Sequence, residues 1–162
     1  CFAKDNIEEA LALASLQSKA THASRHAEQC CQILTELLCQ LLNGKPLPSA
    51  LEQTHKRQLN SEIRTMMRRK IVEESEDDIQ SDGYVINTLH AALWSTLTTD
   101  SFESAVLRAC NLGDDADTTA AVAGQIAGAM YGHSNIPHDL KVDLMDERKL
   151  YVTSQFFSHK AG

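Results

Sequence analysis

The chain has 162 residues, of which 43% are hydrophobic, so it is long and apolar enough to fold as one domain with a buried core. Its 15 Lys and Arg against 22 Asp and Glu give a formal charge of −7, which excludes a basic surface for nucleic acid or anionic lipid. No apolar run reaches the ~18 residues of a membrane span and no signal peptide is visible, so we expect a cytoplasmic protein.

The five cysteines show no metal-ligand spacing, and two of them are adjacent. Cys31 and Cys39 fall in an apolar helical stretch, where free thiols behave as small hydrophobic side chains. We therefore expect a reducing compartment rather than a disulfide framework. The first residue, Cys1, is not an initiator Met, which predicts a processed product or a fragment.

The first half of the sequence predicts two helices. In residues 6–19, apolar positions follow one helical stripe and Asn6 is placed to cap the first turn. Residues 24–43 carry a more apolar stripe typical of a buried helix, and Gly44 ends it. Pro46 then introduces a turn.

The middle of the chain is more polar. The basic run 68–70 is typical of a solvated helix end, where the helix dipole favours positive charge. The acidic stretch 72–83 predicts a loop.

The second half predicts a helix over 84–97, another over 102–111 capped by Asp100 or Ser101, and a third over 118–131. Two shorter helices are expected after Pro137. No strand-like alternation persists anywhere. We therefore predict an all-α fold, a compact multi-helix bundle in which residues 1–162 form a single domain.

Three carboxylates, Asp114, Asp115 and Asp117, lie within four positions and are followed by Thr118. Clustered carboxylates repel one another, and either a helix N-terminus or a hard divalent cation can offset their charge. The pattern alone leaves two interpretations open: capping of the helix that follows, or a metal site.

The helix behind this cluster is built of very small residues, with Gly124 and Gly128 four positions apart on one face. Because each mid-helix glycine costs ~1 kcal/mol relative to alanine, the pair indicates close packing against neighbouring helices. Such packing would hold the acidic segment rigidly.

Several segments, in order, resemble the ADP-ribosylglycohydrolase family. Gly83–Trp94 resembles the family's G-Y-V-x-x-T-L-x-A-A-L-W helix, and Gly113–Thr118 resembles its G-D/G-D-x-D-T loop. Asp100–Val106 matches D-S-F-E-x-A-V, and Thr21-His22 resembles a T-H segment that precedes a long helix. Together the matches run from about residue 5 to the C-terminus.

The resemblance implies an all-α enzyme with two Mg²⁺ or Mn²⁺ ions. It assigns metal binding to Asp115, Asp117 and Thr118. It places His22 and Tyr84 near the ADP-ribose, and Asp114, whose position is often Gly in the family, is assigned to the ligand rather than to the metal. The alternatives are purely structural roles, in which His22 only caps a helix and Tyr84 only packs at a helix start.

The sequence departs from the family in length. Family members are usually much longer, and their N-terminal half carries a G-D-A-x-G segment, an S/T-D-D-T metal motif and the catalytic carboxylate. Neither motif precedes Thr21, so the chain is expected to be truncated at the N-terminus and its catalytic residue is unknown. Since a hard cation takes roughly six oxygen ligands, metal binding by this chain alone should be weak. Truncation would expose the small-residue face of 118–131, favouring the missing half or a second copy as partner.

Three functional hypotheses remain. The chain is part of a glycohydrolase acting on ADP-ribosylated protein or a related ligand, or an inactive remnant that binds a partner, or a structural protein, since the family contains lens crystallins. The retained acidic residues favour a history of metal binding over the structural role.

Overall fold

The computed structural model describes residues 5–54, 58–142, 149–153 and 155, and within these ranges the chain forms helices and turns without strands. This confirms the all-α prediction. Cys1 lies outside the described residues, as does part of the segment expected to form the last helices. The elements are α1 Ile7–Thr21, α2 Arg25–Leu42, α3 Leu47–Thr54, α4 Ser61–Met67, η1 Ile71–Glu73, η2 Glu76–Asp78, α5 Val85–Leu97, α6 Phe102–Asn111, α7 Ala116–Tyr131, η3 His133–Asn135 and α8 His138–Val142.

Side-chain caps start the helices where the sequence indicates. The Asn6 side chain accepts a hydrogen bond from the amide of Glu9 and so starts α1. For α6, Ser101 is the cap and Asp100 is not, because the Ser101 hydroxyl accepts from the Ser104 amide in a capping box. The turn expected at Pro46 is the first turn of α3, since the Pro46 carbonyl accepts from the amide of Ala50.

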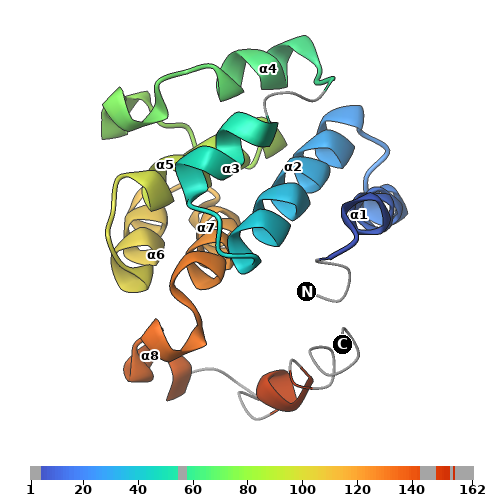
Figure 1. The fold of residues 1–162 in the computed structure, drawn as a ribbon. Helices are drawn as coiled ribbons and strands as arrows, with labels where there is room; N and C mark the ends of the chain where they lie inside the picture. The colour runs from blue at the N-terminus through green and yellow to red at the C-terminus, as the bar shows by residue number, and fades with distance from the viewer. Residues whose placement is uncertain (1–4, 55–57, 143–148, 154, 156–162) are drawn as a thin grey trace.

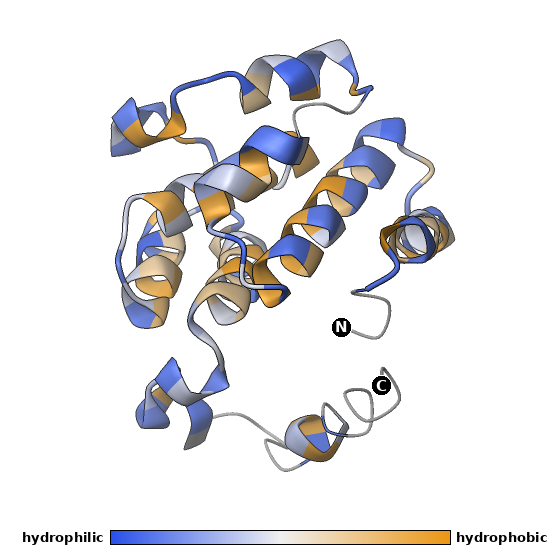
Figure 2. Cartoon of the chain, in the orientation of Figure 1, coloured by the Kyte–Doolittle hydropathy of each residue, from blue (hydrophilic) through white to orange (hydrophobic). Residues whose placement is uncertain are grey.

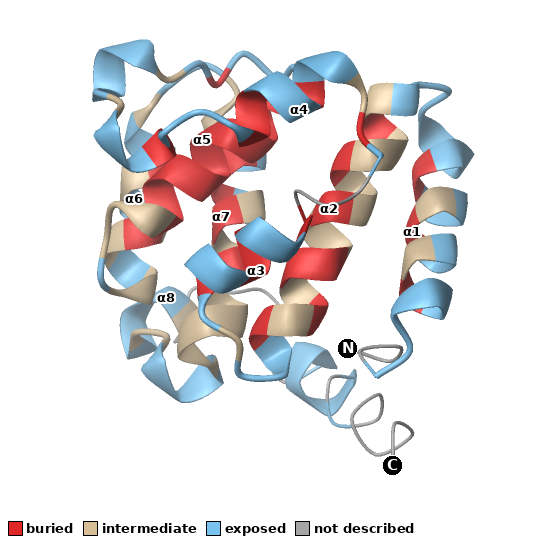
Figure 3. Ribbon diagram, turned by 45° about the horizontal axis from the view of Figure 1, so that its top comes forward, coloured by how far each residue is buried: buried red, intermediate tan, exposed pale blue. Residues whose placement is uncertain are grey.

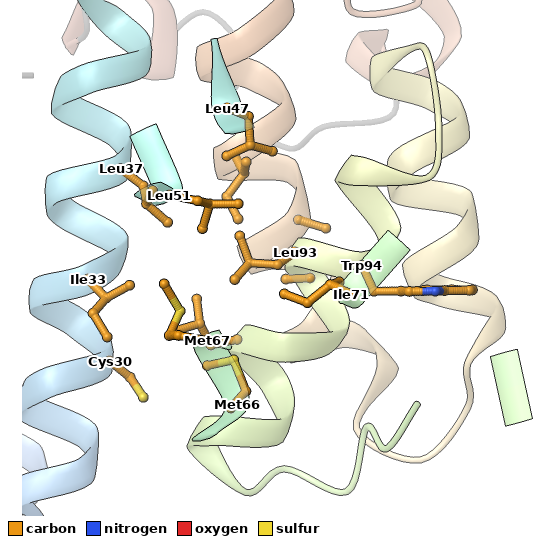
Figure 4. Close-up of a cluster of buried hydrophobic side chains, with 14 of the residues drawn as sticks. Cys30, Ile33, Leu37, Leu47, Leu51, Met66, Met67, Ile71, Leu93 and Trp94 are labelled. Carbon is orange, nitrogen blue, oxygen red and sulfur yellow. The ribbon is translucent and has the colours of Figure 1, made fainter. Parts of the chain in front are cut away.

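The helices pack around α5 and α7, which contact each other in the middle of the bundle. Helix α2 packs against both, α1 lies against the outer side of α2, and α6 packs against α5 and α7. Figure 3 shows α5 buried along almost its whole length, whereas α1 exposes its outward side. None of the described helices is long and apolar enough to cross a membrane.

The hydrophobic core lies between α2, α3, α4 and α5 and continues onto α7. Figure 2 shows the apolar and polar faces of α2 that produce this packing. Ile33, Leu37 and Leu93 are completely buried, each contributing about 1.5–3 kcal/mol of burial free energy. Trp94 is also a core residue, and its indole Nε1 donates to the Glu74 carbonyl at 3.0 Å.

The small-residue face of α7 is covered within this chain, contrary to the expectation that truncation exposes it. Ala123 and Ala127 are fully buried, and a Cβ built at Gly124 or Gly128 would meet α6 side chains at ordinary contact distance. The reason is that α2, α5 and α6 surround α7 on three sides. The side of α7 that these helices leave uncovered carries the exposed Thr118 and the residues one helical turn after it.

The acidic stretch predicted as a loop contains two short 3₁₀ turns, η1 and η2. Ser75 and Asp78 form a capping box that starts η2. The basic run lies at a helix end, as predicted, with Arg68 as the C-cap of α4. Arg69, however, is not simply solvated, because its Nε forms an ion pair with the Glu74 carboxylate. This segment is therefore tied to the bundle rather than free.

Candidate functional site

The acidic loop between α6 and α7 is held by the segment that precedes α5. The Ser81 hydroxyl donates to the Gly113 carbonyl at 2.8 Å. The Ser81 carbonyl accepts from the Asp115 amide at 2.9 Å. Two segments that lie more than 30 residues apart in the sequence therefore meet at the N-terminus of α7.

The loop itself turns sharply. Gly113 has φ 78°, which glycine adopts readily, and Asp114 follows with φ 50° in the left-handed region. Aspartate is one of the few non-glycine residues that visit this region, but it does so at some cost. The turn directs the chain into α7 with Asp114 exposed and Asp115 half-buried.

Asp115 occupies the N-cap position of α7, yet its side chain makes no capping hydrogen bond to the backbone. Instead, Oδ1 accepts from the Thr118 hydroxyl at 2.8 Å. A Cβ at Gly83 would lie 2.9 Å from Oδ2, so the carboxylate rests directly against the backbone of residue 83. The interpretation of the acidic cluster as capping alone loses its main support.

The donors suit a hard cation. Thr118 and Asp117 are exposed in the first turn of α7, close to Asp115, and all three residues offer oxygen atoms. The 2.8 Å between Thr118 Oγ1 and Asp115 Oδ1 is close to the spacing of about 2.9 Å between adjacent oxygens around a six-coordinate Mg²⁺. The described part of the chain holds no cluster of three His, Cys, Asp or Glu arranged for a metal.

Tyr84 follows Gly83 directly and lies at the same end of the bundle. Its hydroxyl is hydrogen-bonded to Nδ1 of His26 at 2.9 Å, and the two rings meet edge to face. Nε2 of His26 lies 4.0 Å from the Glu62 carboxylate. Partial desolvation, with Glu62 nearby, raises the pKa of the Tyr84 phenol above its ordinary value, so the hydroxyl stays protonated at neutral pH.

His22 is the exposed C-cap residue of α1, and its Nδ1 is hydrogen-bonded to the Thr21 hydroxyl at 2.8 Å. It lies four positions before His26, which is in the first turn of α2 and contacts Tyr84. The structure thus links Asp114, Asp115, Asp117 and Thr118 to Tyr84 through the segment at Ser81. It shows no direct contact of His22 with that group.

Sequence reasoning missed two residues here, His26 and Ser81. His26 carried no clear signal, because His22 ends α1 whereas His26 lies in α2, so their spacing does not place them on one helix face. Ser81 carried none, because a serine in an acidic, polar stretch has no periodicity that marks it as buried.

A family model described as ADP-ribosylglycohydrolase matches residues 1–160 of the chain. The chain belongs to the ADP-ribosylglycohydrolase family. The fold agrees with this assignment: a solved structure described as an ADP-ribosylglycohydrolase-related protein complex superposes with a TM-score of 0.90 and 31% sequence identity, covering 99% of this chain and 56% of that one.

Two curated relatives show the extent of the likeness. The ADP-ribosylarginine hydrolase Tri1 of Serratia proteamaculans (strain 568) is 39% identical over 149 residues, which cover 92% of this chain and 40% of the relative. The ADP-ribosyl-[dinitrogen reductase] glycohydrolase of Rhodospirillum rubrum is 29% identical over 142 residues, which cover 83% of this chain and 44% of the relative. The chain thus spans less than half the length of these glycohydrolases.

Proposed function

We propose that this chain supplies the metal-binding and ligand-facing part of an enzyme that hydrolyses the bond between ADP-ribose and a modified protein. The observation that carries the proposal is the contact between the Thr118 hydroxyl and the Asp115 carboxylate, beside an α7 N-terminus that no side chain caps. The relative named ADP-ribosylarginine hydrolase supports an ADP-ribosylated protein as substrate.

The residues that would hold Mg²⁺ or Mn²⁺ are Asp115, Asp117 and Thr118, with Asp114 exposed beside them on the ligand side. When bound, such a cation would orient ribose hydroxyls and polarise the bond to be cleaved. Tyr84 would contribute a protonated hydroxyl to the ligand, held in direction by His26. His22 would stand at the rim of the same end of the bundle.

Asp115, Asp117 and Thr118 would supply only some of the roughly six oxygen ligands that a hard cation takes, so a further source of ligands is expected. We propose that it is the remaining part of the glycohydrolase fold, which the Serratia relative carries within its own longer chain. A second copy of this chain is the alternative source of oxygen ligands. A reducing, cytoplasmic location fits Cys30, Cys31 and Cys110, which are free thiols.

The test of the metal site is calorimetric titration of Mn²⁺ and Mg²⁺ into the chain, with and without ADP-ribose. We expect weak saturable binding of Mn²⁺ that the double variant Asp115→Ala/Asp117→Ala loses. The matched control is Glu76→Ala/Asp77→Ala, which removes two exposed carboxylates from η2 and should leave the affinity unchanged. Equal binding by all three proteins would contradict the assignment of these residues.

The test of the activity adds the separately expressed N-terminal part of the Serratia relative and measures release of ADP-ribose from an ADP-ribosylated arginine substrate. We expect release only from the mixture, and only in the presence of metal. Metal binding without release would support the hypothesis of an inactive binding module.

Tyr84→Phe is expected to weaken ADP-ribose binding about fivefold, the equivalent of roughly 1 kcal/mol for one hydrogen bond. The aromatic ring stays in place, so the melting temperature should barely change. Tyr131→Phe, which removes a hydroxyl from the opposite end of α7, is the control. Equal affinities for ADP-ribose in both variants would rule out Tyr84 as a ligand residue.

A further inference from the structure

Ser81 is a buried serine that lies outside every helix. It is 2% exposed, in a stretch whose other residues are mostly exposed. Its hydroxyl and its carbonyl both point to the acidic loop: the hydroxyl donates to the carbonyl of Gly113, and the carbonyl accepts from the amide of Asp115. The two hydrogen bonds therefore bracket Asp114 on either side.

Asp114 is the one described non-glycine residue with a positive φ, at 50°. An L-amino acid keeps this conformation when its surroundings impose it, because the alternative regions are lower in energy. Asp114 is exposed and has no packing of its own to impose it. The bonds that Ser81 makes to the residues before and after it supply the restraint.

The direction of the Asp115 carboxylate depends on the same restraint. Its amide is fixed by the Ser81 carbonyl, and its two oxygens lie against the Thr118 hydroxyl and Gly83. If the turn at Asp114 relaxed, the Cα of Asp115 would rotate and its carboxylate would leave the Thr118 hydroxyl. The donors that face one cation would then separate.

We propose that Ser81 is a positioning residue for the metal half-site, setting the direction of Asp115 through the turn at Asp114. This proposal rests on the proposed function, because only a metal site gives the direction of Asp115 a role. The restraint of the loop by Ser81 does not depend on that function. Ser81 is not itself proposed as a ligand, because its side chain is buried, whereas Asp117 and Thr118 are exposed.

Positioning can be separated from a general effect on stability. Gly113 is exposed, so water can replace the Ser81 hydroxyl at its carbonyl and the fold loses little. Water cannot fix the turn, because it is not anchored to the rest of the bundle. The expected pattern is therefore a loose loop in a stable protein.

The experiment compares Ser81→Ala with Ser95→Ala. Ser95 is a fully buried serine on α5 whose hydroxyl bonds to the Ala91 carbonyl within its own helix, so it matches Ser81 in residue type and burial. Amide hydrogen exchange at Asp115, whose amide donates to the Ser81 carbonyl, should become about tenfold faster without metal in Ser81→Ala and remain unchanged in Ser95→Ala. The melting temperature of Ser81→Ala should fall by no more than about 4 °C. Ser81→Thr, which keeps the hydroxyl, should restore slow exchange.

Mn²⁺ titration of the same variants measures the consequence for the site, and we expect about tenfold weaker binding in Ser81→Ala alone. Unchanged exchange at Asp115, or equally fast exchange in Ser81→Thr, would overturn the restraint. Faster exchange with unchanged Mn²⁺ affinity would overturn the positioning role. If the wild-type chain binds no Mn²⁺, the proposed function fails for this chain, and the exchange data still decide whether Ser81 restrains the loop.

Discussion

Gly83→Ala is expected to abolish measurable Mn²⁺ binding while leaving the helices folded. Two effects combine at this position. Gly83 has φ 79°, where an alanine costs roughly 1–2 kcal/mol of conformational strain. The new methyl group would also lie 2.9 Å from Oδ2 of Asp115, which is too close for non-bonded atoms. The carboxylate can rotate away at little cost in stability, but it then no longer lies beside the Thr118 hydroxyl.

Gly44→Ala is a matched control for this prediction. Gly44 has almost the same backbone conformation, φ 80°, and a Cβ there would meet nothing within 4 Å. Both variants should therefore lose similar free energy of unfolding in urea denaturation, whereas only Gly83→Ala should lose Mn²⁺ affinity, by tenfold or more. The same Mn²⁺ affinity in the two variants would show that contact with residue 83 does not orient Asp115.

Helices α1, α2, α5 and α6 were predictable because their information is local, whereas α3 and α4, in the more polar middle of the chain, were not predicted. Apolar periodicity and single capping residues such as Asn6 and Ser101 set the ends of α1, α2, α5 and α6, and tertiary packing did not override them. The acidic loop was predictable as a candidate site for the same reason, since its carboxylates are consecutive in the sequence.

What holds the site together was not predictable, because those contacts join distant positions. The hydrogen bond from Ser81 to Gly113 spans 32 residues, and that between His26 and Tyr84 spans 58. Nothing in the spacing of either pair indicates the contact. The prediction that the small-residue face of α7 is exposed was wrong for a similar reason. Small residues show that a helix packs closely, but they do not show that α6 is the helix that covers them.

The same limitation applies to a buried polar group outside the site, which joins η1 to α5. The Glu74 carboxylate lies 2.7 Å from Nε2 of His90, although the two atoms are not aligned for a hydrogen bond. Its other oxygen pairs with Arg69, and the Glu74 backbone carbonyl accepts from Trp94. Side-chain exposure is 4% for His90 and 13% for Glu74, so this pair lies in a region of weak solvent screening.

Glu74→Ala is therefore expected to lower the free energy of unfolding by about 2 kcal/mol, since it leaves the buried Nε2 of His90 and the Nε of Arg69 without the carboxylate that lies beside them. Glu73→Ala provides the control within the same 3₁₀ turn. Its ion pair with Lys70 is exposed, at 76% for Lys70 and 63% for Glu73, so its loss should cost less than about 1 kcal/mol. Urea denaturation of both variants at neutral pH checks the prediction, which fails if the two substitutions cost the same.

The pH dependence of stability gives an independent test of the same group. Burial lowers the pKa of His90 below its ordinary value, and this effect exceeds the opposing attraction of Glu74. The folded state therefore binds the His90 proton less readily than the unfolded state does, so the free energy of unfolding is largest above the unfolded pKa and falls as the pH drops through the folded pKa. His90→Gln removes the titrating ring and should flatten this part of the curve below about pH 6.5. A wild-type curve that stays parallel to that of His90→Gln through this range would mean that folding does not lower the pKa of His90.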